Sequence, residues 1–391
     1  MDSGLVGAGK QLLHVDIYID EHQPSRGILA LLSRLRPNWK AQDIQMKTFT
    51  EGITNQLIGC YVGSLLEPGC VLVRLYGKMT ELYVNRDHEV EMFQILHAHR
   101  CGPEIYCSFQ NGICYEFVRG TVLDDKLLQQ PSIYRLIAAE MGKIHSIQPK
   151  SGRPVKPVLW TKMSHFLKLV QSSVSSSPAG QWYIGSSADL QKVPSFKTLS
   201  QEMESLKRHL SEIDSPTVLC HNDLLTKNII YNEKEGMVKF IDYEYADYNY
   251  QAFDIGNHFN EFAGVNDVNY DLYPSWELQR DWLTAYLESY KHSTGREVTV
   301  TEAEVTQLYI QVCKFSLVLL LEGLEYLNIM RLVYAFQQHP YVCRAVEWRG
   351  GNISPSYFNN LLFQLAPPTQ RKPNHPQLTH HCSNFDGLHL S

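Results

Sequence analysis

The first third of the chain carries the apolar pattern of a small antiparallel β-sheet. The segments FTEGITNQLIGCYV and CVLVRLYG are rich in branched residues, which favours strands, and the turn formers Pro68 and Gly69 separate them. The segment EIYCSFQNGICYEFV predicts a β-hairpin that turns at Asn111-Gly112, because Asn-Gly is a strong hairpin signal. These strands together predict one sheet.

Helical periodicity appears beside these strands and dominates after them. Residues Ile28–Trp39 have the apolar spacing of a short helix, and NRDHEVEMFQILHAH places Val90, Phe93 and Leu96 at helical spacing. After Gly120 the pattern is mainly helical, as in SIYRLIAAEMGKIHSI and SQEMESLKRHL. A sheet that carries one helix, followed by a run of helices, indicates the α+β class.

A second hairpin is predicted in the middle of this helical part. Ile229–Tyr231 and Val238–Ile241 are strand-like, and NEKEG between them has the composition of a turn. Folded about Glu235, this hairpin would place Asn228 opposite Asp242, because antiparallel pairing keeps the sum of paired residue numbers constant. We therefore expect an amide oxygen and a carboxylate to meet at the open end of the hairpin.

Composition narrows the classes of function. A length of 391 residues suggests two domains or lobes, and a net charge of −6 argues against nucleic acid as the main partner. Nine scattered cysteines without a CxxC pair indicate reduced thiols in a cytoplasmic protein and no zinc site.

The hydropathy pattern predicts neither a signal peptide nor an integral membrane segment. The N-terminus lacks a basic start followed by an apolar run. The most apolar stretch, Phe315–Phe336, is interrupted by Glu322, Glu325, Asn328 and Arg331, so a buried helix is favoured over a membrane span.

The octet HNDLLTKN supplies candidate chemistry for phosphoryl transfer. Asp223 lies on the loop that leads into the second hairpin and is free to act as a base, while His221 is placed to brace that loop. Asn228 and Asp242 offer the hard oxygen ligands that suit Mg²⁺. In kinases one aspartate accepts the proton of the attacking hydroxyl, and an asparagine with a second aspartate holds the metal. The alternative is an Asx-capped turn beside a plain hairpin.

A cation in the first third completes this kinase-like pattern. Arg74 is the lone charge in CVLVRLYG, and Glu89 on the following helix is its natural partner. Protein kinases pair a strand lysine with a helix glutamate in the same way. The alternative is a salt bridge at a lobe surface.

These residues, in this order, resemble the choline/ethanolamine kinase family, and within it the ethanolamine kinases. The match is carried by LRPNWK, FTEGITNQL, VLVRLYG, CHNDLLTKNIIY and FIDYEYADYNYQAFDIGNHFNEFAG, within Ile28–Phe315. The resemblance implies a protein-kinase-like bilobal α+β fold and ATP-dependent phosphorylation of ethanolamine, a step toward phosphatidylethanolamine. We expect a flexible tail at 1–27, a nucleotide-binding N-lobe at 28–118, a mainly helical C-lobe at 119–336 that binds the amine, and a divergent, largely disordered tail at 337–391.

The resemblance also implies roles for individual residues. Asp223 would be the base and His221 its brace, and Mg²⁺ would be held by Asn228 and Asp242 with help from Glu244. The ATP contacts would come from one set, with the hinge at Glu116–Val118: Thr50, Gly52, Thr54, Asn55, Arg74, Glu89, Glu116 and Val118.

The substrate side is expected in the segment that follows Asp242. An ammonium alcohol needs carboxylates and aromatic faces, and both are interleaved there. Glu261 is the favoured amine contact. For Asp254 an anchoring role in the catalytic loop is favoured over substrate contact, by analogy with the kinase fold. Most of the aromatic rings are expected to be packing residues.

Beyond Phe315 the resemblance ends, and this opens an alternative to an active ethanolamine kinase. The family continues with a tryptophan-containing helix that helps close the amine pocket, whereas this chain continues with SLVLLLEGLEYLNIM. This alternative is a catalytically weak isoform that regulates an intact kinase by pairing with it. Whether the chain forms a homodimer or a heterodimer is left open. Choline kinase is a separate alternative within the enzyme class.

Overall fold

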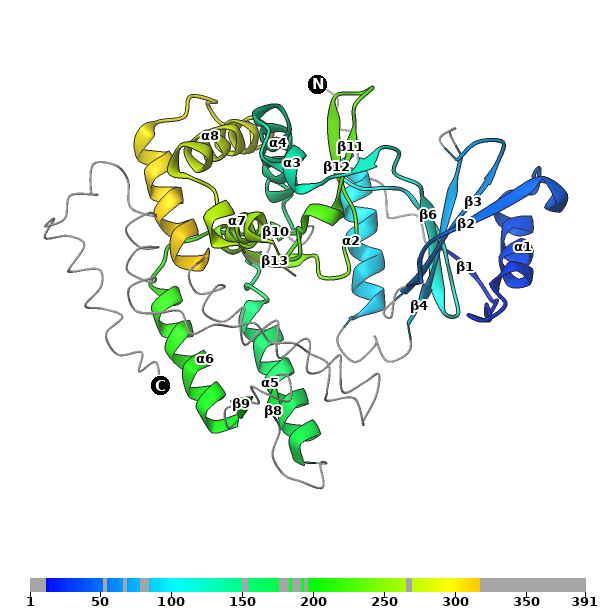
Figure 1. The fold of residues 1–391 in the computed structure, drawn as a ribbon, viewed down its shortest axis with the longest axis horizontal. Coiled ribbons are helices and arrows are strands. Elements are labelled where there is room, and N and C mark those ends of the chain that lie inside the picture. The colour runs from blue at the N-terminus through cyan, green and yellow to red at the C-terminus, as the bar shows by residue number, and fades with distance from the viewer. Residues whose placement is uncertain are drawn as a thin grey trace, which may run out of the picture. The chain divides into compact units, whose positions relative to one another are not determined.

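The computed structural model describes residues 12–51, 55–65, 69–77, 84–149, 154–175, 183–184, 191–192, 196–264 and 269–316 (Figure 1). The chain forms two compact units. The first unit comprises the described residues of Met1–Gln129 and Leu219–Asp247, and the second those of Gln130–Val218 and Tyr248–Ser391. The octet HNDLLTKN, residues 221–228, thus belongs to the same unit as the N-terminal sheet.

A six-stranded sheet forms the centre of the first unit, in the order β1-β5-β6-β4-β3-β2. β1 runs parallel to β5, and the other neighbours are antiparallel. The strands are β1 (Leu13–Val15), β2 (Ile44–Glu51), β3 (Asn55–Val62), β4 (Val71–Tyr76), β5 (Ile105–Phe109) and β6 (Gly112–Glu116). Residues 13–15, which the sequence interpretation assigned to a flexible tail, form the edge strand β1.

Strand alternation assigns the two faces of this sheet to two helices (Figure 1). Val71, Val73 and Leu75 of β4 join the core against α1 (Pro24–Leu35). Leu72, Arg74 and Tyr76 point to the other face, which α2 (Arg86–Ala98) covers. α1 begins and ends about four residues earlier than the apolar spacing predicts. Its early start has a physical reason, because Pro24 is a favourable first-turn residue.

The β5–β6 hairpin turns at Gln110-Asn111, one residue before the predicted Asn111-Gly112. Phe109 and Gly112 are the last paired residues, so Gly112 lies within β6. A Cβ at Gly112 would lie 2.1 Å from the carbonyl oxygen of Arg74. The glycine is therefore needed for close strand packing and not for the turn itself.

Short elements complete the first unit. The segment FTEGITNQLIGCYV, for which the sequence predicts strand structure, contains the end of β2 and the whole of β3. Residues 52–54 between them lie outside the described part. The hairpin of β11 (Ile229–Asn232) and β12 (Met237–Phe240) pairs with β7 (Thr121–Val122). The remaining short elements are η1 (Ala41–Asp43), α3 (Asp125–Leu128) and η3 (Thr226–Asn228). β10 (Thr217–Cys220) and β13 (Asp247–Tyr250) each contain a unit boundary.

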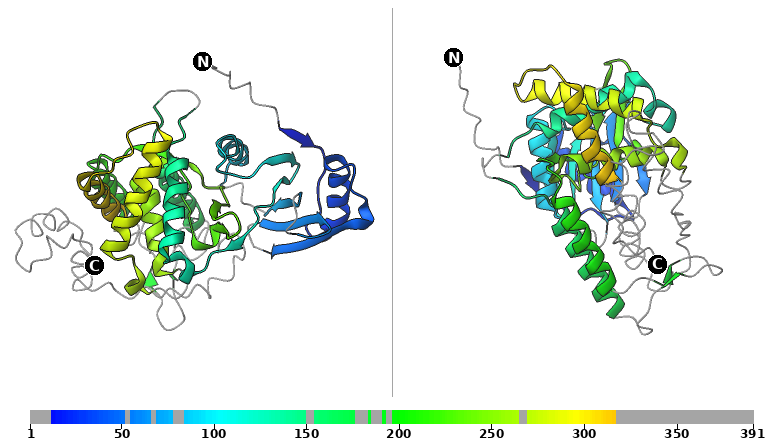
Figure 2. Two further views of the ribbon diagram at one scale, coloured as in Figure 1. Left: turned by 90° about the horizontal axis from the view of Figure 1, so that it is seen from above. Right: turned by 90° about the vertical axis from the view of Figure 1, so that its left-hand side faces the viewer.

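The second unit is mainly helical. α4 (Pro131–His145) and α8 (Trp276–Ser293) lie side by side (Figure 1, Figure 2). A Cβ at Gly142 would lie 2.8 Å from the carbonyl oxygen of Tyr286, so this glycine permits the close approach of the two helices. The other elements are α5 (Leu159–Ser175), β8 (Tyr183–Ile184), β9 (Gln191–Lys192), α6 (Phe196–Ser211), α7 (Gln251–Asn260), η4 (Glu261–Ala263), η5 (Tyr270–Leu272) and a helix over 302–316.

Among the helices that the structure describes, none is both long and apolar enough to span a bilayer. The most apolar stretch, Phe315–Phe336, lies almost entirely outside the described residues. The C-terminal segment 337–391 lies wholly outside them.

Candidate active site

The β11–β12 hairpin has a register one residue away from the predicted one. Ile229 pairs with Phe240, and the amide of Ile241 donates to the carbonyl oxygen of Asn228 at 3.0 Å. Asn228 therefore lies opposite Ile241, and the prediction that it faces Asp242 is wrong. The reason is the turn: four residues, 233–236, close the hairpin, whereas the prediction assumed five.

The two oxygen-bearing side chains still come from the same end of the hairpin. Asp242 directly follows Ile241, the partner of Asn228. The side-chain amide of Asn228 donates to the backbone carbonyl of Asp223 at 2.9 Å, which ties the loop of Asp223 to the start of β11. Asp223 itself is half-buried.

Asp223 and Asp242 are each placed by an unusual backbone conformation, at the preceding residue Asn222 in one case and at Asp242 itself in the other. Asn222 and Asp242 have φ of 65° and 66°, in the left-handed region that residues other than glycine seldom adopt. The side chain of Asn222 donates to the carbonyls of Tyr245 and Asp247, at 3.0 and 3.3 Å, and so stabilises this geometry. Each reversal turns the chain at or just before an acid, and such conformations are concentrated at functional sites.

His221 connects the loop of Asp223 to the end of β12. It is 2% exposed, and its Nε2 donates to the carbonyl oxygen of Ile241 at 3.0 Å. Its ring packs against Phe240 and Tyr243. The imidazole therefore links the loop of Asp223 to the strand end that carries Asp242.

Tyr243 shows that part of the aromatic run is packing. It is buried, its ring lies edge-on against Phe93 of α2, and its hydroxyl lies 3.0 Å from the carbonyl oxygen of Cys101. Phe253 and Phe259 of the second unit are buried as well. These rings stabilise the fold and leave no aromatic face for a ligand.

Arg74 is the centre of a cluster of carboxylates. Its Nη1 lies 3.1 Å from Glu89 Oε1 and 3.1 Å from Asp242 Oδ1, and its Nη2 lies 2.6 Å from Glu244 Oε2. Arg74 is 4% exposed and Glu89 is 1% exposed. The structure thus joins the expected strand–helix ion pair to two of the expected metal ligands.

Charge and burial oppose each other in this cluster. Burial alone would lower the pKa of Arg74, but the negative charges of Asp242, Glu89 and Glu244 outweigh it and raise this pKa. Burial, and after it the charge of Asp242, raise the pKa of Glu244 against the opposing effect of Arg74. The guanidinium is therefore held as a permanent cation among the carboxylates.

Sequence reasoning missed Arg86, the first residue of α2. Its Nη1 donates to Glu89 Oε2 at 2.8 Å and lies 3.5 Å from Glu244 Oε2. Its guanidinium carbon lies 4.0 Å from the ring centroid of Tyr76. The available signal was its position three residues before Glu89, since residues at this spacing share a helix face.

The other expected nucleotide contacts are spread over the sheet. Thr50 lies in β2 opposite Leu57, and Asn55 lies in β3 opposite Tyr76. Gly52 and Thr54 fall outside the described residues.

The expected hinge follows β6. Glu116 ends this strand, is exposed, and accepts from the amide of Glu104 at 3.2 Å. Val118 is half-buried two residues later. This carboxylate is therefore engaged with its own sheet.

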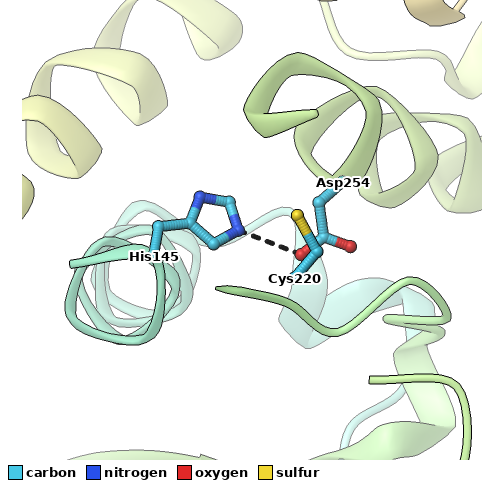
Figure 3. A group of neighbouring side chains, drawn as sticks. All are labelled: His145, Cys220 and Asp254. Atoms are coloured by element: carbon cyan, nitrogen blue, oxygen red, sulfur yellow. Dashed lines mark hydrogen bonds and ion pairs between the residues drawn. The ribbon is translucent and has the colours of Figure 1, made fainter. Parts of the chain in front are cut away.

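Asp254 of α7 lies in the interior of the second unit (Figure 3). It is 0% exposed, and its Oδ2 lies 3.0 Å from Nε2 of His145. His145 Nδ1 lies 2.8 Å from the hydroxyl of Tyr286, which accepts from Gln251. These contacts hold Asp254 within the second unit, and its expected role in anchoring the loop of Asp223 stays a prediction. Glu261, the favoured amine contact, begins η4 and is half-buried.

The first-unit residues have the chemistry of a magnesium site. Asp242 and Glu244 offer carboxylates and Asn228 an amide, which are hard oxygen donors of limited number. The side chain of Asp242 keeps 39% of its surface exposed, so that its carboxylate is reachable. The donor set therefore fits Mg²⁺.

The fold is that of a protein-kinase-like phosphotransferase of the α+β class, as the sequence predicts. The structure is similar to that of Plasmodium vivax ethanolamine kinase, with a TM-score of 0.69 and 24% sequence identity over 90% of each chain. A structural similarity at 24% sequence identity establishes the fold and nothing more specific.

The chain belongs to the choline/ethanolamine kinase family, which it matches over residues 46–322. It is 52% identical to human ethanolamine kinase 1 over 298 residues, which is 76% of this chain and 64% of that protein. It is 50% identical to human ethanolamine kinase 2 over 301 residues, 77% of this chain and 73% of that protein. The match thus spans just under two thirds of the first of these relatives.

Proposed function

We propose that this chain is an ATP- and Mg²⁺-dependent ethanolamine kinase that makes phosphoethanolamine for phosphatidylethanolamine synthesis. The observation that carries the proposal is the cluster of Arg74 with Glu89, Asp242 and Glu244, beside a loop that presents Asp223. Family membership and the identity to two ethanolamine kinases support the substrate.

In this proposal Asp223 accepts the proton of the ethanolamine hydroxyl. The hydroxyl oxygen forms a bond to the γ-phosphorus of ATP, and the bond from that phosphorus to the bridging oxygen breaks, leaving ADP. Asn228 and Asp242 would hold Mg²⁺, with Glu244 at its waters, and the ion would neutralise phosphate charge when bound. His221 keeps the base loop against the strand end of Asp242 through its bond to Ile241.

The second unit supplies the remaining roles. Asp254 is assigned to anchoring through its bond to His145, and Glu261 to contact with the ammonium group. We place the protein in the cytoplasm, because the cysteines of the described residues form no disulfide, as a reducing compartment favours.

The test measures phosphorylation of ethanolamine and, separately, of choline by the purified chain, with the product monitored by ³¹P NMR. We expect ethanolamine to have the higher kcat/KM. Asp223→Ala should lower kcat by about 10²–10⁴-fold, the usual contribution of a general base. Asp43→Ala removes an exposed aspartate of η1 and is the matched control.

Three outcomes separate the alternatives. Near-normal activity in Asp223→Ala would exclude the mechanism. A higher kcat/KM for choline would assign the chain to choline kinases. A chain that turns over only after mixing with an intact family member would support the weak, pairing isoform.

A further inference from the structure

Arg86 contacts two of the three carboxylates that Arg74 contacts, Glu89 and Glu244. The two oxygens of Glu89 are divided between them, Oε1 to Arg74 and Oε2 to Arg86. The single oxygen Oε2 of Glu244 lies 2.6 Å from Arg74 Nη2 and 3.5 Å from Arg86 Nη1. Arg86 therefore already flanks the oxygen that Arg74 binds.

Both terminal nitrogens of Arg74 are engaged by acids in this arrangement. Its two terminal nitrogens contact Glu89, Asp242 and Glu244, all at 3.1 Å or less. To donate to a nucleotide phosphate, Arg74 has to give up some of these contacts. The carboxylates left behind are almost completely buried in the case of Glu89 and Glu244, with 0% and 8% of their side chains exposed. A buried carboxylate without a counter-ion is costly.

The charge balance shows why a second cation is needed. Three carboxylates face two guanidinium groups in this cluster, which leaves one negative charge. Without Arg86, three carboxylates would face Arg74 alone, leaving two negative charges. Arg74 would then be held more tightly by the acids and would be less available to a phosphate.

Arg86 is well fixed for this role. It starts α2, its side chain is 13% exposed, and its guanidinium stacks on the ring of Tyr76 at the end of β4. A planar guanidinium can stack and bind two acids at once, whereas a lysine ammonium is a single point charge. The position is therefore specific for arginine.

We propose that Arg86 is a positioning residue that neutralises Glu89 and Glu244 and so allows Arg74 to exchange carboxylate contacts for a nucleotide phosphate. This inference rests on the proposed function, and it assigns to Arg86 an effect on nucleotide binding and not on the amine.

The test compares Arg86→Gln and Arg86→Lys with the wild-type full chain. Isothermal titration calorimetry measures the Kd for ADP with Mg²⁺, steady-state kinetics give KM for ATP and for ethanolamine, and thermal unfolding reports the fold. Arg135→Gln is the matched control, because Arg135 also binds a carboxylate, that of Asp281 at 2.7 Å, but is 57% exposed.

Arg86→Gln should raise the Kd for ADP and the KM for ATP by about 10-fold, the effect of one charged hydrogen bond. KM for ethanolamine should stay within about two-fold, since the same contact does not serve the amine. Arg86→Lys should recover part of the nucleotide affinity. Arg135→Gln should match the wild type.

Unchanged nucleotide affinity in Arg86→Gln would overturn the inference, and so would an equal rise in both KM values, which indicates general damage to the fold. If Arg86→Gln does not fold, Tyr76→Leu removes the stacking partner and should weaken ADP binding in the same direction; unchanged binding there overturns the inference too. Wild-type protein that binds ADP but phosphorylates no ethanolamine would refute the proposed function alone, and the calorimetric comparison would still decide the role of Arg86.

Discussion

Replacing Arg74 by methionine should destabilise the first unit far more than the loss of a surface ion pair would. Methionine keeps an unbranched apolar stem like that of arginine but is shorter and removes the charge. Glu89, whose side chain is 0% exposed, would keep its ion pair with Arg86, and Asp242 would lose its ion pair with Arg74. Removing one member of a buried ion pair typically costs about 3–5 kcal/mol, because an uncompensated charge remains in the interior.

Hydrogen exchange of the β4 amides, residues 71–76, measures this loss in the unit that contains it. We expect the free energy of opening to fall by about 3–5 kcal/mol in Arg74→Met. Arg135→Met, which breaks the exposed pair with Asp281, should change the free energy of unfolding of the second unit by less than about 1 kcal/mol.

A double variant tests whether the cost comes from the unpaired charge. Arg74→Met combined with Glu89→Leu should lose less stability than the sum of the two single variants, because the buried charge is removed with its partner. A loss below about 1 kcal/mol in Arg74→Met, or additive losses in the double variant, would refute the reasoning.

Two further predictions follow from local geometry. Gly112→Ala should lower the thermal unfolding midpoint clearly, because its Cβ would lie 2.1 Å from the carbonyl of Arg74; an unchanged midpoint would contradict the strand packing described above. Glu304 has a pKa lowered to about 2, first by its bond to Lys291, so its pairing stabilises the folded state above pH 4.5 and is lost as the pH falls toward 2. Glu304→Gln should therefore show a smaller drop in unfolding temperature between pH 5 and pH 3 than the wild type, and equal drops would contradict this assignment.

The amino-acid sequence by itself determined the local elements and the chemistry of the octet. Runs of branched residues between turn formers predict β4 and its neighbours, and helical spacing predicts α2, because both patterns depend on residues close in sequence. The positions of His221, Asp223 and Asn228 in one loop are likewise local. The family resemblance on these motifs agrees with the match over residues 46–322.

Tertiary structure decided the features that depend on distant contacts. The register of the β11–β12 hairpin differs from the prediction by one residue, because the residue types of NEKEG predict a turn but do not fix whether it has four or five residues. Residues 13–15 form a strand only because β5 offers them an edge. Arg74 meets Asp242 and Glu244 across 168 and 170 residues of sequence, and no periodicity encodes such a contact. Arg86 meets Glu244 in the same way, whereas its pair with Glu89 lies within α2 and is local in sequence.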